Sequence, residues 1–482
     1  MDLAPCSFLS VLPSFITIIL AFYTRQVLLA LFAGILTGGI VLFLQTGDWA
    51  TLNIIRTFIV PALSSQSYAI ITLIYLWCVG GILGIWAKTG NAEYFAQQLG
   101  KKIAKGRRSA LFLAWLLGVI FHQGGTISTI LTGTTVKPVA DHYKVSHEEL
   151  SYVVDSTGSP IAGLIPFNPW PLYISGLIIG TTPLFETLTD CYKYYIASIV
   201  FNFYCIIAVT FTLLFSLDLM PWVGTKMQQA INRSKKYKLL DDPKSQPLVC
   251  LQATPDCHEG FQPNILGFII PIIILLSISI IPFFAWQLGW IAQEYAVMTN
   301  EAFLLATVAA CLIAYGQGLP LQAIMEGFIA GCQEMTAGAI ILGLAMTLAE
   351  VAQKVHTADY LITLISPNIP IVLLPVILTV LCMIVTFSTG TSFGTFAVVL
   401  PVAMPLAYCL NPAPTFTKIC FGAVMGGTIF GDQCSPISDT TILSSLFSGC
   451  DLMDHVKSQL PLSLLAIFLS IVLSSLCTLF LL

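Results

Sequence analysis

Apolar runs long enough to cross a lipid bilayer recur along the whole chain and leave few alternatives to a membrane protein. A spanning helix needs about 20 consecutive apolar residues. Only 9% of the residues are charged, whereas soluble domains have about 25%. The sequence therefore predicts an all-α, polytopic membrane protein rather than an enzyme with a soluble core. The clearest apolar runs are 8–22, 27–44, 68–87, 194–217, 265–284, 328–348, 371–387 and 462–482.

Net charge and the positions of the cysteines argue against a nucleic-acid partner and a metal cofactor. The net charge is only −4, and no broad basic patch indicates a nucleic-acid partner. No basic segment precedes the first apolar run, so we expect no cleavable signal peptide. With its many apolar runs, the chain is expected to be a multi-pass protein of the plasma (inner) membrane. Most of the 14 cysteines lie in apolar runs, where they act as small hydrophobic residues. We expect no cofactor, because Cys250, Cys257 and His258 form only a weak metal motif.

Residues 431–445 place a dense polar cluster directly after an apolar, helix-like run. The stretch contains Asp432, Asp439, Pro436 and six hydroxyl side chains. A charged residue at membrane depth is costly and usually faces a cavity or a bound ion. Proline disrupts the helical hydrogen bonds one turn back and frees carbonyl groups. Carboxylate, hydroxyl and carbonyl oxygens are the ligands that hard cations prefer, so the stretch predicts an ion site.

The two halves of the chain repeat the same order of features. Residues 124–126 and 390–392 are Gly/Thr/Ser-rich breaks that follow apolar runs. Asp155 then precedes Ser159-Pro160, as Asp432 precedes Ser435-Pro436. Matching breaks in two halves indicate a transporter with a binding site near the membrane midplane. We predict one repeat over 1–217, a polar cytoplasmic linker over 218–263 and a second repeat over 264–482. Each repeat should hold a re-entrant hairpin, the first at 127–144, and a broken transmembrane helix.

Loop charges predict that the two repeats are inverted. The loop 88–108 carries six basic residues, whereas 350–369 carries only Lys354. Basic loops lie on the cytoplasmic side, so the two loops should face opposite sides of the membrane. The charged cluster at 141–149 is expected to be a solvated turn.

These motifs resemble the NhaC-type sodium/proton antiporters of the ion transporter superfamily. The resemblance is carried by residues 431–445, by 390–396, by Asp155-Ser156-Thr157 and by residues 23–27. It implies two repeats, each with a re-entrant hairpin and an unwound helix, and coupling of sodium to protons. Gln433 departs from the family, which frequently has His there, and glutamine cannot titrate. Some family members carry organic acids or amino acids, so the cargo does not follow from the motif.

Three functions compete on these residues. A sodium/proton antiporter would hold sodium and protons alternately on Asp155, Asp432 and Asp439. A sodium- or proton-coupled carrier would add a small organic acid or amino acid, its carboxylate held at helix N-termini beside Thr126 and Thr391. An intramembrane aspartyl protease fits poorly, because Ile429 occupies the position of the first glycine in that motif.

The antiporter hypothesis defines the expected site and partners. Asp155, Asp432 and Asp439 are the expected sodium ligands. Besides sodium and protons, the expected partners are the lipid bilayer and a second copy of the chain, with an organic anion or amino acid as the alternative cargo. The full candidate ion and substrate site is Asp155, Ser156, Thr157, Ser159, Thr126, Gly390, Thr391, Ser392, Asp432, Ser435, Ser438, Asp439 and Thr440.

Overall fold

The computed structural model describes residues 8–24, 27–65, 68–69, 72–122, 125–246, 261–287, 290, 298–356, 360, 370–436 and 438–481. Every regular element in these residues is a helix, as the sequence predicts. The first half contains α1 (Leu12–Thr24), α2 (Val27–Thr46), α3 (Val60–Leu63), α5 (Gly80–Thr89), α6 (Asn91–Ile103), α7 (Arg107–Ile120), α8 (Gly125–His142), α9 (His147–Ser156), α10 (Ser159–Ala162), α11 (Pro169–Ile178), α12 (Leu188–Ser198) and α13 (Phe203–Ser216). The linker contains α14 (Thr225–Tyr237). The second half contains α15 (Leu266–Gln287), α16 (Thr299–Gly316), α17 (Leu321–Lys354), α19 (Leu373–Thr389), α20 (Ser392–Leu410), α21 (Pro414–Cys434), α22 (Asp439–Ser448) and α23 (Leu452–Leu481). Short 3₁₀ or π-helical turns cover Phe8–Val11, Trp49–Leu52, Ile55–Ile59, Leu73–Val79 and Ile199–Phe201.

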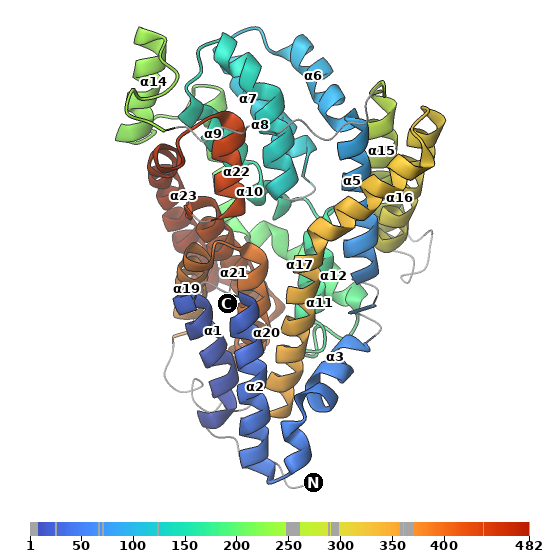
Figure 1. Cartoon of the computed structure of the whole chain (residues 1–482). Coiled ribbons are helices and arrows are strands. Elements are labelled where there is room, and N and C mark those ends of the chain that lie inside the picture. Colours follow the sequence, from blue (N-terminus) through green and yellow to red (C-terminus); the bar gives the residue numbers. More distant parts are fainter. Residues whose placement is uncertain are drawn as a thin grey trace.

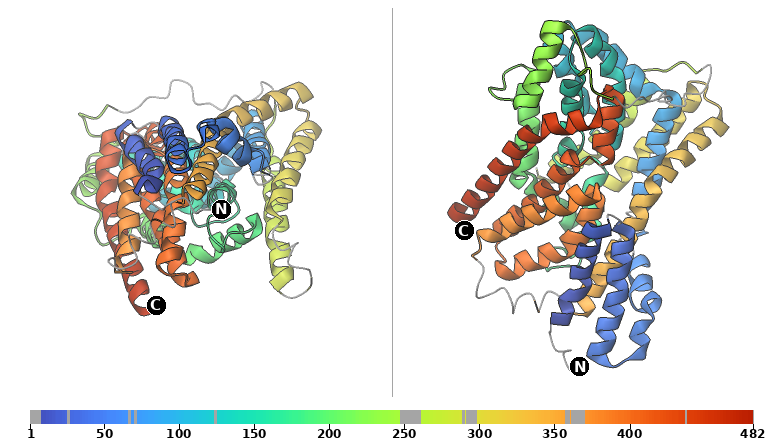
Figure 2. Two further views of the ribbon diagram at one scale, coloured as in Figure 1. Left: turned by 90° about the horizontal axis from the view of Figure 1, so that it is seen from below. Right: turned by 60° about the vertical axis from the view of Figure 1, so that its left-hand side comes forward.

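Helices from the two halves of the chain interleave. α1 and α2 pack against α17, and α1 also packs against α19 and α20, while α5 crosses α17 (Figures 1 and 2). The α5–α17 crossing is a contact between glycines. A Cβ on Gly84 would lie 1.9 Å from the Gly327 carbonyl oxygen, and one on Gly331 would lie 1.9 Å from that of Gly80. Small residues of this kind let membrane helices approach closely.

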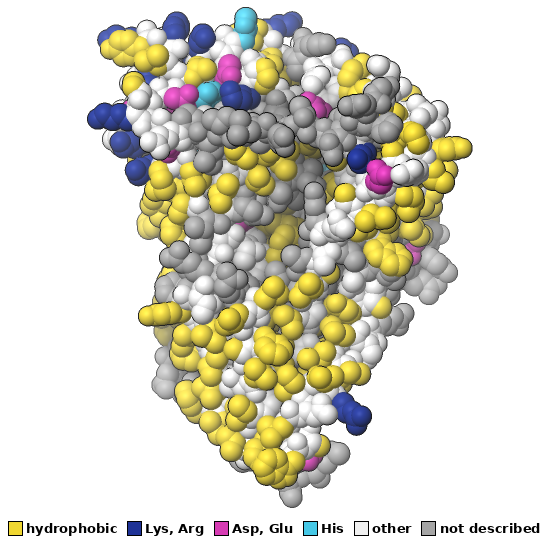
Figure 3. Space-filling view, in the orientation of Figure 1, with side chains coloured by type: hydrophobic (Ala, Val, Ile, Leu, Met, Phe, Trp, Pro, Cys, Tyr) yellow, Lys and Arg dark blue, Asp and Glu magenta, His cyan; other side chains and the backbone are white. Residues whose placement is uncertain are grey.

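Three helices in the described residues are long and apolar enough to cross a membrane. They cover 28–46, 392–410 and 452–481. The 188–201 and 203–216 segments would form a fourth span if the 54° bend between them is counted as internal. Large apolar side chains on these and other helices are exposed, and Figure 3 shows them covering much of the face between the charged end and the opposite tip. A surface of this kind suits contact with lipid.

Two helix hairpins occupy corresponding places in the two halves. α7 turns into α8 at the Gly/Thr-rich break, and α19 turns into α20 at Gly390, whose φ of 70° ends α19 in the left-handed conformation. The prediction that 127–144 is itself a hairpin is wrong, because α8 is continuous from Gly125 to His142. Its hydroxyl residues Thr129, Thr132 and Thr135 are buried at three-residue spacing. α8 packs against α22, α7, α6 and α9, and burial of this small polar face within the protein makes a full helix possible where hydropathy alone predicted a break.

Both predicted breaks near the aspartates are present. α9 ends at Ser156, one residue after Asp155, and the short α10 begins at Ser159. α21 ends at Cys434, two residues after Asp432, and α22 begins at Asp439. The two carboxylates therefore lie in the last turns of interrupted helices. Whether the two halves are inverted repeats stays a prediction.

Candidate functional site

Asp432 is the centre of a buried cluster of hydroxyl groups. Its side chain is 3% exposed. Ser159, at the start of α10, donates to Oδ2 at 2.9 Å, and Ser438, just before α22, donates to Oδ1 at 2.7 Å. The Ser438 hydroxyl also lies 3.0 Å from that of Thr440. Residues from both halves of the chain thus surround one carboxylate with oxygen atoms.

The break after α21 is stabilised by side chains that donate hydrogen bonds to the backbone carbonyl groups left without a helical partner. Pro436 lies in the break and has no N–H to continue the helix. The Thr441 hydroxyl lies 3.1 Å from each of the Asp432 and Gln433 carbonyl oxygens. The amide of Gln459 also donates to the Gln433 carbonyl, at 2.5 Å. These carbonyl groups, which the sequence suggested as ion ligands, therefore already accept hydrogen bonds from side chains.

Asp155 forms a second centre with different partners. Its Oδ2 lies 3.0 Å from His455 Nε2 and accepts from Gln459 Nε2, also at 3.0 Å. His455 Nε2 is in addition 3.2 Å from the Ser444 hydroxyl. Asp155, His455 and Gln459 are all 0% exposed. α23 thus supplies both hydrogen-bond partners of this carboxylate.

Gln433 connects the two centres. Its amide nitrogen donates to Ser156 at 2.7 Å and to Ser463 at 3.3 Å, while its side-chain oxygen accepts from Tyr204 at 2.6 Å. Ser156 is adjacent to Asp155, and the backbone carbonyl of Gln433 is held by Gln459. The residue in the place of the family histidine is therefore a structural link between α9, α13, α21 and α23.

The first residue of α8 borders the Asp432 cluster. A Cβ on Gly125 would lie 2.7 Å from Ser159 Oγ and 2.6 Å from Thr440 Cγ2. The first N–H groups of a helix have no partner within it and carry partial positive charge. Glycine is thus required for the close approach of this helix end to the hydroxyl groups.

The structure brings some of the predicted site residues together and places others outside the two centres. Asp155, Ser156, Ser159, Asp432, Ser438 and Thr440 belong to the two connected centres described above. Thr157 donates to the Val153 carbonyl of its own helix, at 2.7 Å, and Ser435 donates to Phe387 O at 2.8 Å. Thr391 caps α20 by accepting from Gly394 N at 3.4 Å, between Gly390 and the buried Ser392. The side chains of Thr126 and Asp439 lie outside those that the structure describes, as do Cys250, Cys257 and His258.

Sequence reasoning missed His455 and Gln459. They lie four residues apart in the first turns of the last apolar helix, which puts them on one face of it. A histidine and an amide at helical spacing in the first turns of an apolar helix were the available signal. Their partner Asp155 is 300 residues away from His455, so spacing along the chain could not reveal the contact.

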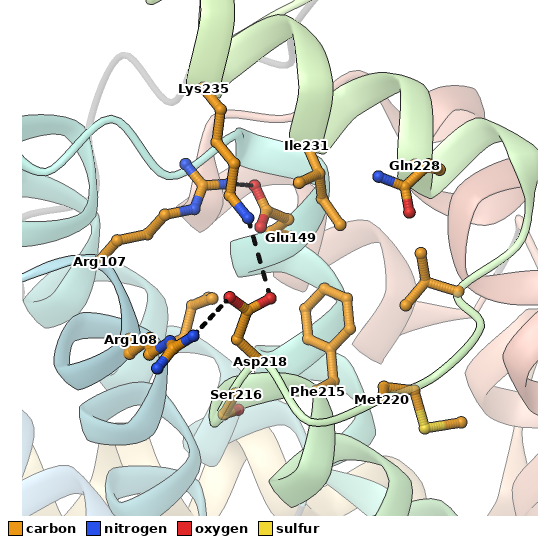
Figure 4. A pocket seen from close by; sticks show the side chains of 12 residues that line it. Arg107, Arg108, Glu149, Phe215, Ser216, Asp218, Met220, Gln228, Ile231 and Lys235 are labelled. Atoms are coloured by element: carbon orange, nitrogen blue, oxygen red, sulfur yellow. Dashed lines mark hydrogen bonds and ion pairs between the residues drawn. The ribbon is translucent and has the colours of Figure 1, made fainter.

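The charged end of the molecule holds ion pairs rather than an open binding site. A cavity of about 90 Å³ between α7, α9 and α14 is lined by Arg107, Arg108, Glu149, Asp218 and Lys235 among others (Figure 4). Arg107 pairs with Glu149, Arg108 with Asp218 at 3.1 Å, and Lys235 with Asp218 at 3.8 Å. Both acidic side chains of this cavity are thus paired with basic ones, and these ion pairs join helices.

The prediction of a solvated turn at 141–149 is wrong for residues 147–149. His147, Glu148 and Glu149 are buried, at 6%, 4% and 2% exposure. Glu148 accepts from Arg233 of α14 at 2.7 and 2.8 Å. The linker folds back over the start of α9 and covers these residues, which the local sequence could not indicate.

Comparisons with known proteins agree with the fold and the motifs. The model of the Na⁺/H⁺ antiporter family matches residues 161–478. An uncharacterized protein of Haemophilus influenzae is 32% identical over 94% of this chain and 87% of its own length. Shorter matches include the Na⁺/H⁺ antiporter NhaC of Alkalihalophilus pseudofirmus, 40% identical over 17% of each chain. The malate-2H⁺/Na⁺-lactate antiporter of Bacillus subtilis is 35% identical over 20% of this chain and 19% of its own.

Solved structures show the same fold. The Alcanivorax borkumensis YdaH transporter superposes with a TM-score of 0.60 over 98% of this chain and 99% of its own, at 13% identity. The resemblance to NhaC-type proteins is confirmed by the family match and by the named relatives. With its interrupted helices and buried carboxylates, this chain belongs to the Na⁺/H⁺ antiporter family.

Proposed function

We propose that this protein is a secondary active transporter that exchanges sodium for protons at a carboxylate site centred on Asp432. The observation that carries the proposal is the burial of this carboxylate among the hydroxyl groups of Ser159 and Ser438, at helix breaks from both halves of the chain. We place the protein in the plasma membrane with its basic linker in the cytoplasm.

The chemistry follows from the cost of burying charge. An ionised carboxylate removed from water needs a compensating positive charge, or it takes up a proton and becomes neutral. Hydroxyl and carboxylate oxygens suit a hard cation such as sodium, which binds as cargo. In the described residues, no three His, Cys, Asp or Glu side chains gather as ligands of a resident metal. Because either a proton or sodium can neutralise Asp432, binding of one disfavours the other.

Transport in proteoliposomes tests the proposal. A pH-sensitive dye inside the vesicles should report proton movement when sodium or lithium is added, and Asp432→Asn should abolish it, because the amide cannot exchange a cation for a proton. Glu186→Gln makes the same change at an exposed carboxylate and should transport normally. Wild-type rates in a correctly inserted Asp432→Asn protein would rule out this site.

A second candidate function is a sodium- or proton-coupled carrier of a small organic acid or amino acid. The start of α8 beside Ser159 and Thr440 is favourable for a substrate carboxylate. One relative is named as an antiporter of malate and lactate. Vesicles challenged with a panel of organic anions and amino acids distinguish the two functions. Sodium-dependent uptake of a labelled acid, with no proton movement from sodium alone, would favour the carrier.

A further inference from the structure

The hydrogen bonds assign the two buried aspartates to different groups of helices. Asp432 is bonded by Ser159 of α10 and by Ser438 before α22. Asp155 is bonded by His455 and Gln459, both on α23. This arrangement differs from the single joint site that the sequence suggested.

Three polar atoms around Asp155 have no hydrogen-bond partner within the described part of the chain. They are Asp155 Oδ1, Gln459 Oε1 and His455 Nδ1. Asp155 Oδ1 and Gln459 Oε1 belong to two groups that are hydrogen-bonded to each other, whereas Nδ1 lies on the side of the His455 ring away from Asp155. Buried polar groups are nearly always paired, because an unpaired one loses its hydration without compensation. Three such atoms in fully buried neighbouring side chains indicate that the cluster binds something.

The two unpaired oxygens, Asp155 Oδ1 and Gln459 Oε1, can both act as acceptors. The orientation of the Gln459 amide is determined by its neighbours, since its nitrogen faces two acceptors, Asp155 Oδ2 and the Gln433 carbonyl. Its other atom must therefore be the oxygen. A carboxylate oxygen and an amide oxygen without competing donors suit a cation better than an anion.

We propose that Asp155, Gln459 and His455 form a second cation-binding site, separate from the Asp432 site, that takes a sodium-sized monovalent ion. The carboxylate and amide oxygens bind the ion, and His455 positions the carboxylate through its other oxygen. The assignment of sodium rests on the proposed function. The protein then carries two cations per chain when both sites are loaded.

The two sites are connected through one residue. Gln459 holds the backbone carbonyl of Gln433, the neighbour of Asp432, and the Gln433 side chain holds Ser156, the neighbour of Asp155. A shift of Gln459 on binding an ion would therefore displace the Gln433 carbonyl group at the end of α21. The affinities of the two sites should be coupled, and the coupling must act equally in both directions.

Equilibrium binding of radioactive sodium to the purified, detergent-solubilised full chain tests the second site. The wild type should bind two ions per chain. Asp432→Asn and Asp155→Asn should each bind one, because each loses a different carboxylate. Gln459→Met, which keeps the length of the side chain and removes the amide oxygen, should keep one ion and weaken the other about tenfold or more. Gln322→Met on the exposed face of α17 is the matched control and should bind two.

The outcomes separate this proposal from the proposed function. A wild type that binds one ion, lost in Asp432→Asn but kept in Asp155→Asn and Gln459→Met, would overturn the second site and leave the antiporter proposal standing. One ion lost in both aspartate variants would mean a single joint site and would also overturn it. No saturable sodium binding by the wild type would contradict the proposed function itself. Thermal melting and monodispersity of every variant show that a lost ion does not reflect misfolding.

Discussion

At the scale of single residues, the antiporter hypothesis depends on Asp432 exchanging sodium for a proton. Gln433 cannot titrate, so at the Asp432 site the carboxylate must carry the pH dependence of sodium binding. If one proton is displaced per sodium ion, acid should weaken sodium affinity by up to tenfold per pH unit. Sodium binding to the purified protein between about pH 6 and about pH 9 measures this. An affinity that stays flat across the range would contradict exchange at a shared carboxylate and favour the organic solute carrier.

At the scale of elements, the segment after α14 holds together the starts of the two helices that carry Asp155 and its partners. Asp241 lies 2.8 Å from Nδ1 of His147, in the first turn of α9. Further along, Gln246 N donates to Asp451 at 3.0 Å, and Ser245 donates to Asp454 at the start of α23. The linker segment 238–246 is thus positioned to restrain α9 and α23.

The charge of His147 should determine how firmly this segment is held. Burial lowers the pKa of His147, but its hydrogen bonds to Asp141 and Asp241 outweigh burial and raise the pKa from 6.5 to about 9, while nearby Lys137 lowers it slightly. Other charged groups at this end are Glu148 with Arg233, and Asp451 and Asp454 beside the buried Cys450. A histidine whose pKa is raised by folding contributes stability that is complete below about pH 6.5 and is lost as the pH rises through about 9. The contribution is at most about 3 kcal/mol.

We therefore expect the linker segment 238–246 to loosen at alkaline pH. Hydrogen exchange of its amides, corrected for the intrinsic pH dependence of exchange, should increase between about pH 8 and about pH 10. His147→Gln should remove most of this change, whereas His142→Gln, at an exposed side chain, should keep it. Equal protection of the segment across the pH range in the wild type would show that His147 does not hold it.

At the scale of the whole molecule, the described parts of the basic loop 88–108 and of 350–369 lie toward opposite ends. α6, within 88–108, lies at the upper end in Figure 1, which is the charged end in Figure 3. Lys354 donates to the Thr57 carbonyl beside α3, toward the other end. We predict that the two loops face opposite sides of the membrane, because basic loops stay in the cytoplasm. In a cysteine-free background that still transports, Lys102→Cys and Gln353→Cys should react with an impermeant maleimide from opposite sides. Labelling of both from one side would refute the inverted arrangement.

The sequence by itself determined the class of protein and the two helix breaks that follow Asp155 and Asp432. Long apolar runs with few charges allow only a membrane fold built from helices. Proline lacks the N–H that would continue a helix, and the structure has breaks at Pro436 and at the Ser159-Pro160 pair. Other prolines, such as Pro138, Pro282 and Pro401, nevertheless lie inside helices, so a proline by itself does not decide a break. The turn before α20 was also evident, because the left-handed conformation found at Gly390 is one that glycine adopts without strain.

Only the tertiary structure decided which side chains meet. The pairing of Asp155 with His455 and the burial of His147 beneath the linker join segments far apart in the chain. α8 stays helical over 125–142, because its polar face is buried in the protein. The local sequence indicates that a polar group is buried at a cost in free energy. The hydrogen-bond partner that offsets this cost is determined by how the helices pack. The sequence could therefore indicate that Asp155 and Asp432 need partners, while the folded chain assigned hydroxyl groups to one and α23 to the other.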